Sequence, residues 1–425
     1  MTLTPSRRLY GLGAVMFAAL VACARVPSSV GAPSYLVTLT IAGVAYLFAL
    51  REFFRTPRYA RHVIFVCLAL AALWRVPFLL MPPGGQDDTR RYVWDGRLQR
   101  LGYNPYVVIP ADPAFAALHT SQTRQMNNPD VPSPYPAGAQ LFFRAITAIH
   151  ESTFAFKVAF VICDLLIALL LYLELRRLGL GEHWVLAYAW HPLIVTDVAA
   201  SGHVDILGVL LLLVSAAALA RRWRATAAVS FALAVAVKFF PIVLAPLFWR
   251  RVRPRDALLA AFVVAALYVP FLEHGRFPIG SLGIFVLRFR FNDPIFPVLE
   301  RVAGAYGAAG LAALFGFLTA LWLRRKDPAC APDPWVWPMA ASLVCAPVVY
   351  PWYLLWFLPF LRSVQTLPLT VWSISILSTY FVWYQHDLGG PWRVPLWITL
   401  LEYGSVVTTA LIIGQRWPTR PAAPG

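Results

Sequence analysis

The sequence predicts an all-α polytopic membrane protein. Of its 425 residues, 59% are hydrophobic and only 13% are charged, and the mean hydropathy is +0.64. Soluble domains carry about 25% charged residues, so a chain of this length has too few polar side chains to cover two or three soluble domains. Apolar runs of about 17–22 residues alternate with short segments rich in arginine or proline, as expected for helices that cross a hydrocarbon core roughly 30 Å thick.

The net charge of +16 does not indicate a nucleic-acid partner. The arginines cluster at the ends of the apolar runs, where they set the topology of a membrane protein and contact lipid headgroups. Five cysteines are present, most of them inside apolar runs and none in a CxxC pair. Neither a disulfide framework nor a zinc site is therefore indicated.

The apolar runs give a topology with both termini in the cytoplasm. Because the basic segments fall on one side only if the short pieces 240–249 and 352–361 also cross, we expect about 12–14 membrane segments. A cleaved signal peptide is the alternative for the first segment. The longer spans lie near 9–24, 34–50, 63–81, 154–174, 184–200, 204–220, 225–239, 256–272, 304–323, 335–348, 366–384 and 395–414.

Two long polar segments divide the chain on the predicted outer side of the membrane. Loops of such length are uncommon unless they are functional. We therefore expect an N-terminal transmembrane hairpin with a basic cytoplasmic loop at 1–62 and a module at 63–272 that includes the first outer loop, 82–152. The second outer loop follows at 273–303, and C-terminal transmembrane helices occupy 304–425.

The first outer loop opens with two adjacent acids, Asp87 and Asp88. Either can cap a helix that ends near Gly102. Because Trp94 and Leu98 share one face of that helix, we expect it to be amphipathic and to lie at the membrane surface. The acid pair has two interpretations, helix capping with nearby arginines or a base or metal site at the lipid–water boundary. Adjacent acids repel, so one pKa would rise, which suits a proton acceptor.

This loop carries a family resemblance. The run DDTRRYVWDGR at 87–97, followed by GYNPY at 102–106, resembles the first outer loop of the GT-C superfamily of integral-membrane glycosyltransferases, and most closely its bacterial mannosyltransferase branch. Relatives usually present this loop after the first span and often have His at the position of Tyr350, so residues 1–50 resemble an added hairpin. The similarity continues in the same order through SPYP at 133–136, SGHVD at 201–205, KFFP at 238–241 and YPWY at 350–353.

The resemblance implies a GT-C-like helical bundle and an inverting glycosyltransferase. Such an enzyme moves a sugar, with mannose the first candidate, from a polyprenyl-phosphate donor to an acceptor hydroxyl. The resemblance also assigns the role of catalytic base to the acid pair, and we favour Asp88 over Asp87. The departing phosphate is already a good leaving group, so cations take the place of a general acid.

Four residues are candidates for binding the donor phosphate. Lys238 lies inside an apolar run, where a charge costs about 2.5–3.5 kcal/mol, and Pro241 beside it predicts a helix end that opens onto a cavity; snorkelling to an interface is the alternative. Arg288 and Arg290 in the second outer loop are spaced to clasp a phosphate, unless they meet lipid headgroups. His203 contacts phosphate or sugar, or is a structural histidine.

The remaining candidates would bind the sugar. The aromatic ones among them equally fit the aromatic belt of a membrane protein. No metal ligands and no cofactor are predicted, although paired acids leave a divalent cation open. The candidate substrate-binding residues are Arg91, Tyr92, Asp205, Tyr350, Trp352 and Tyr353.

The sequence thus predicts a multi-pass glycosyltransferase of the bacterial plasma (inner) membrane whose active site faces the periplasm or cell exterior. Its expected partners are a polyprenyl-phosphate sugar, a glycolipid or polysaccharide acceptor and the lipid bilayer. A polytopic lipid or sugar transporter or flippase is the alternative, but a transporter would place charges near mid-membrane on paired repeats, and no repeat is visible. An inactive structural membrane subunit is a third possibility.

Overall fold

The computed structural model describes residues 4–25, 30–82, 88–273, 278–326 and 331–416. These residues are predominantly helical, and no strand occurs among them. An isolated bridge pairs Phe291 with Val348. The predicted all-α class is confirmed.

Eight helical segments in the described ranges are long and apolar enough to cross a membrane. This confirms a multi-pass membrane protein. They are α1 (Pro5–Arg25), α2 (Pro33–Arg55), α3 (Arg61–Leu79), α6 (Thr153–Arg177), α11 (Pro254–Tyr268) with η6 (Val269–Phe271), α13 (Phe296–Leu323), the run from η9 (Val364–Thr366) through α15 (Leu367–Ser375) and η10 (Ile376–Tyr380) to α16 (Phe381–Asp387), and α17 (Leu396–Arg416).

The other predicted spans are present as shorter or interrupted helices, so fewer segments reach full length than the 12–14 expected. Prolines break several of them, because proline lacks the backbone N–H that a helix interior needs. They are η3 (Glu182–Trp184), α7 (Val185–Ala189), α8 (Pro192–Ile194) and the π-helical η4 (Val195–Ala200), then α9 (Asp205–Ala220), α10 (Arg224–Val237), the 3₁₀ helix η5 (Phe240–Phe248), α14 (Asp333–Leu343), η7 (Pro351–Trp356) and η8 (Leu358–Phe360).

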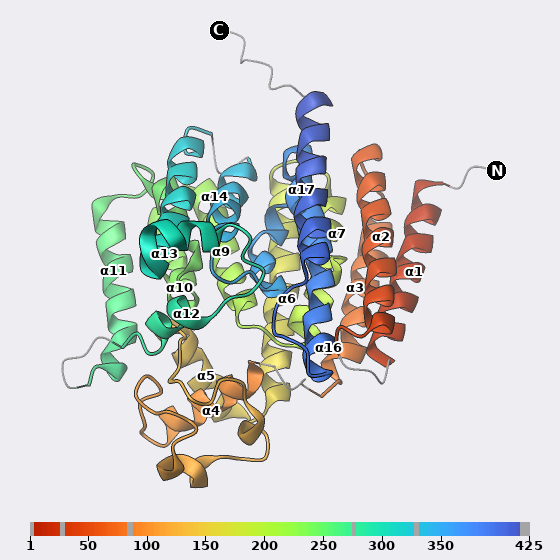
Figure 1. Cartoon of the computed structure of the whole chain (residues 1–425). Coiled ribbons are helices and arrows are strands. Elements are labelled where there is room, and N and C mark those ends of the chain that lie inside the picture. The colour runs from red at the N-terminus through yellow and green to blue at the C-terminus, as the bar shows by residue number, and fades with distance from the viewer. Residues whose placement is uncertain (1–3, 26–29, 83–87, 274–277, 327–330, 417–425) are drawn as a thin grey trace.

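The spanning helices stand side by side, and the first outer loop lies beyond one end of them (Figure 1). The start of α1 and the end of α17 point the other way. The first loop holds α4 (Thr89–Arg100), η1 (Pro113–Leu118), η2 (Thr123–Gln125) and α5 (Ala137–Ile149), and the second loop holds α12 (Leu282–Arg288).

Helix α4 is buried within the protein, so the expectation that its apolar face lies against the membrane is wrong. All but one of residues 89–99 are buried. Trp94 and Leu98, which were expected to face lipid, pack against the chain that follows the helix. Gly102 does end the helix, with a φ of +84° that favours glycine. The loop folds back over the apolar face, which a helical periodicity alone does not reveal.

A buried ion pair joins α3 to α6. Arg75 donates to Asp164 from Nε at 2.5 Å and from Nη2 at 3.1 Å, and Tyr188 of α7 donates to the same carboxylate at 2.9 Å. The Arg75 and Asp164 side chains are 2% and 0% exposed. Charges inside a membrane bundle are stable only when paired, so this contact fixes α3, which leads directly into the first outer loop.

Candidate active site

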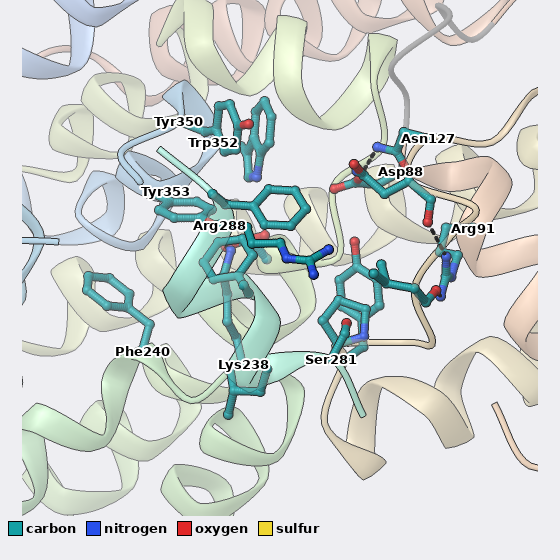
Figure 2. Close-up of a pocket in the computed structure, with 18 of the residues that line it drawn as sticks. Asp88, Arg91, Asn127, Lys238, Phe240, Ser281, Arg288, Tyr350, Trp352 and Tyr353 are labelled. Carbon is teal, nitrogen blue, oxygen red and sulfur yellow. Dashed lines mark hydrogen bonds and ion pairs between the residues drawn. The ribbon is translucent and has the colours of Figure 1, made fainter. Parts of the chain in front are cut away.

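A cavity of about 670 Å³ lies where the two outer loops meet the ends of α9 and α10 (Figure 2). Most of the candidate residues named from the sequence line it. Tyr92 and His203 lie behind its wall, and Asp87 falls outside the described residues. The lining candidates are Asp88, Arg91, Asp205, Lys238, Arg288, Arg290, Tyr350, Trp352 and Tyr353.

Asp88 lies at the N-terminal end of α4, but its side chain does not cap the helix. Its Oδ1 accepts a 2.7 Å hydrogen bond from Asn127 Nδ2, and its Oδ2 lies 3.7 Å from Nδ1 of His203. Burial alone would raise the pKa of this carboxyl, but the imidazole together with the donors Asn127 and Tyr135 holds the pKa of Asp88 below its usual value. Asp88 is therefore an ionised carboxylate at the edge of the cavity.

His203 faces Asp88 rather than the cavity. Its ring lies flat on the indole of Trp352, with centroids 3.9 Å apart and planes at 11°. Its Nε2 lies 3.9 Å from Oδ1 of Asp197, on η4. His203 is 3% exposed and does not line the cavity, so the structure does not bring its ring to the open space where a donor phosphate was expected to meet it.

Lys238 ends α10 and points into the cavity (Figure 2). Its backbone is extended, with φ −152° and ψ 134°, at the point where α10 ends and the chain turns into η5. Its Nζ donates a 2.6 Å hydrogen bond to Asp205 Oδ1, which also accepts one from Trp356 Nε1 at 2.7 Å. The ammonium also lies 3.7 Å from the centre of the Tyr353 ring. Lys238 is thus a partly exposed cation that already has a counter-ion.

Arg288 and Arg290, at and after the end of α12, differ in their surroundings. Arg290 donates to Glu300 at 2.5 Å and to two backbone oxygens, and its guanidinium lies over the Phe296 ring. The side chain of Arg288 is exposed to the cavity and makes no hydrogen bond or ion pair with any described residue. Figure 2 shows its guanidinium pointing into the open space on the side of Asp88. Of the two, Arg288 has its charge free for a ligand.

Arg91 and Tyr92 hold the first outer loop in place, and of the two only Arg91 lines the cavity. Arg91 touches the cavity, but its guanidinium donates to Asp95 and to the backbone oxygens of Asn128 and Val131 at 3.2, 3.2 and 2.7 Å. Tyr92 is 1% exposed. It stacks on buried aromatic rings, and its hydroxyl accepts the backbone N–H that follows His203.

The acid of the WDGR motif, Asp95, holds the first outer loop together. It accepts hydrogen bonds from Ser133 at 2.5 Å, from Gln140 at 2.9 Å and from Arg91 at 3.2 Å. Burial raises the pKa of Asp95, although these three partners oppose the shift. Asp95 does not line the cavity. Its contact with Ser133 joins the WDGR segment to the SPYP segment.

Aromatic side chains form the wall opposite Asp88. Tyr350 stacks on Trp352 at 4.4 Å, which continues the stack that begins at His203. Trp383 and Trp392, which were not predicted from the sequence to belong to the site, also line this wall. Flat aromatic faces of this kind suit the apolar faces of a sugar ring. Trp356, in contrast, is fully buried and acts only as a donor to Asp205.

Asn127 was not predicted from the sequence to be a partner of Asp88. The two residues are 39 positions apart, so no local pattern links them. Among the residues that the structure describes, no group of three or more His, Cys, Asp or Glu is arranged to hold a metal ion.

A family model described as alpha-(1->6)-mannopyranosyltransferase, N-terminal domain, matches residues 11–252. The match covers more than half of the chain and contains Asp88, Asn127, Asp205 and Lys238. The chain belongs to this mannosyltransferase family. No curated protein matches the chain significantly.

The family assignment makes the protein a GT-C mannosyltransferase with a multi-pass membrane domain. The matched stretch begins inside α1, so it includes both helices of the N-terminal hairpin. It ends ahead of α11, so the part of the cavity wall formed by Arg288, Tyr350 and Trp352 lies outside it. The cavity of this mannosyltransferase is therefore built jointly by its matched and unmatched halves.

Proposed function

We propose that this mannosyltransferase takes mannose from a polyprenyl-phosphate donor and transfers it, with inversion, to an acceptor hydroxyl at the outer face of the bacterial plasma membrane. One observation carries the proposal. An ionised acid, Asp88, and two cations, Lys238 and Arg288, line a single cavity together with stacked aromatic rings.

In this mechanism Asp88 is the base. The acceptor oxygen gives its proton to the Asp88 carboxylate as it forms a bond to the anomeric carbon. The bond between that carbon and the phosphate oxygen breaks, and its electron pair leaves with the polyprenyl phosphate. A single displacement of this kind inverts the anomeric centre. If the product is an α-mannoside, as the family description names it, the donor must be a β-linked mannosyl phosphate.

The negative charge that develops on the departing phosphate needs cations already in place. Arg288 is the first candidate because its guanidinium has no partner among the described residues. Lys238 is the second, and its ion pair with Asp205 holds it at the cavity wall. Arg290 is engaged by Glu300 and would act mainly by shaping the loop.

The orientation of the site follows from the basic segments. The cavity lies beyond the Leu79 end of α3, and the arginine-rich segment 51–61 lies at its other end. Arginine and lysine are enriched on the cytoplasmic side of membrane proteins. This distribution supports the proposal that the cavity opens at the outer face, where a lipid-linked donor would reach it from the bilayer.

The test uses the purified protein in nanodiscs with a panel of mannose donors. We expect product with polyprenyl-phosphate mannose, none with a nucleotide-diphosphate mannose, and an anomeric configuration opposite to that of the donor by NMR. Turnover of the nucleotide sugar alone would overturn the proposed donor, and retention of configuration would overturn the single displacement. Movement of a labelled lipid across sealed vesicles without any sugar transfer would favour a flippase.

A further inference from the structure

His203 is a buried side chain enclosed by acids. Its ring nitrogens lie 3.7 Å from Asp88 and 3.9 Å from Asp197, within ion-pair range of both carboxylates. The ring is only 3% exposed, and its Nδ1, the atom that faces Asp88, has no hydrogen-bond partner. A buried polar atom without a partner is costly, so its place beside the proposed base calls for a function.

The surrounding structure fixes the ring in this position. The backbone N–H of His203 donates to the Asp197 carbonyl at 3.0 Å. Gly202 has a φ of +74°, and a Cβ there would lie 2.8 Å from a methyl carbon of Thr89, at the start of α4. The flat stack on Trp352 closes the remaining side. The segment that carries His203 is therefore packed against Thr89, the residue that follows Asp88, and the stack on Trp352 keeps the ring from turning into the cavity.

The charges around the ring favour an imidazolium. Asp88 precedes α4, Asp197 lies on η4 and Asp205 begins α9, so acids approach from three elements. The nearby cations have other contacts: Lys238 binds Asp205, and Lys157 of α6 donates to two backbone oxygens at the end of α3. A positive charge stacked on an indole is also favourable.

We propose that His203 is a positioning residue of this active site, a protonated imidazole that Asp197 supports from behind and that fixes the charge and direction of the Asp88 carboxylate. This inference rests on the proposed role of Asp88 as the base. It replaces the expectation that His203 binds phosphate. The only proton transferred is the one that passes from the acceptor hydroxyl to Asp88, while His203 keeps its own proton.

The proposal gives the pH dependence two limits. Burial opposes protonation of His203, but the surrounding carboxylates outweigh it and raise its pKa. The imidazolium is therefore present at low pH and is lost as the pH rises through this raised pKa. Asp88, whose pKa is lowered, becomes protonated only at acidic pH. Transfer should be fastest between these two limits.

The test is His203→Gln, with His191→Gln as the matched control. His191 is another fully buried histidine, and its ring is hydrogen-bonded to Ser373 at 2.8 Å. Removing an opposite charge near a carboxylate shifts its pKa by about 1–3 units. In His203→Gln we expect a lower kcat, a donor KM close to wild type, and an acidic limit moved to higher pH by that amount. The control should keep the wild-type limits.

A second variant, Asp197→Asn, tests the support behind the ring without altering the ring itself. It removes one of the charges that raise the pKa of His203, so the alkaline limit should move to lower pH. If His203→Gln does not fold, Asp197→Asn alone still tests the proposal.

Three results would overturn or redirect the proposal. A slower His203→Gln enzyme with unshifted pH limits would make His203 merely structural. A raised donor KM with unshifted limits would make it a phosphate ligand. Full activity of Asp88→Asn would instead remove the proposed base, which separates failure of the proposed function from failure of this inference.

Discussion

Asn127 donates a 2.7 Å hydrogen bond to Asp88 from 39 residues further along the chain. This bond draws the carboxylate away from the α4 backbone, where an aspartate in this position often caps the helix. The other carboxylate oxygen then faces His203 beside the cavity. The first outer loop thus folds back on its own beginning to set the direction of the proposed base.

Replacing this donor by an acid should weaken the base. Asn127→Asp places a second carboxylate beside Asp88, and a like charge at that distance raises its pKa. The acidic limit of transfer should move to higher pH and the rate at neutral pH should fall. Asn128→Asp is the matched control, because Asn128 lines the same cavity but contributes its backbone oxygen to its bond with Arg91. Identical pH–rate profiles for the two variants would refute this coupling.

The two arginines of the second outer loop should differ in their effect on the donor. Arg288→Gln removes a cation that is free to bind phosphate, and a hydrogen bond to a charged group contributes about 1.5–3 kcal/mol. We expect a loss of roughly 10- to 100-fold in kcat/KM for the donor. Arg290→Gln, which breaks the pair with Glu300, should cost less. Steady-state kinetics at constant ionic strength check this, and a greater loss from Arg290→Gln would reverse the assignment.

The effects of substituting Lys238 and Asp205 on the thermal stability of the protein should depend on each other. Lys238→Met leaves Asp205 buried with only Trp356 as a polar partner, and breaking a buried ion pair costs about 3–5 kcal/mol. The double variant Lys238→Met/Asp205→Asn also removes the unpaired charge of the Asp205 carboxylate, so it should unfold at a higher temperature than Lys238→Met alone. Thermal unfolding in detergent checks the order. A double variant less stable than Lys238→Met would show that the pair is not coupled.

The buried ion pair between Arg75 and Asp164 should contribute far more to the stability of the protein than the exposed pair formed by Arg61. Arg75→Met leaves the fully buried Asp164 carboxylate without its cation, and this should destabilise the protein by about 3–5 kcal/mol. Arg61→Met removes a partner of Glu182 at 3.6 Å, but the Arg61 side chain is 61% exposed, so the cost should be at most about 1 kcal/mol. Equal losses of thermal stability in the two variants would contradict this difference.

Local sequence signals predicted several features of the site. Pro241 indicated a helix end at Lys238, and α10 does end at Val237, with Lys238 in an extended conformation that faces the cavity. The apolar runs predicted the long helices because the length of such runs follows directly from the thickness of the membrane. The resemblance in the first outer loop led to Asp88.

Other features depend on contacts that no local pattern encodes. The helical period placed Tyr92 on α4, but not the rings and the backbone N–H that enclose it. His203 was predicted to bind the phosphate because it stands near Asp205 in a family-like motif, whereas the fold turns its ring toward Asp88. Arg290 and Glu300 form an ion pair that only the return of the second loop brings together.

The most direct test of the central claim is Asp88→Asn in nanodiscs, with donor binding and mannose transfer measured on the same preparation. Asparagine keeps the shape of the side chain but cannot accept the acceptor's proton. We predict that the variant binds polyprenyl-phosphate mannose with near wild-type affinity and transfers no mannose above background. Transfer at the wild-type rate would contradict the assignment of Asp88 as the base.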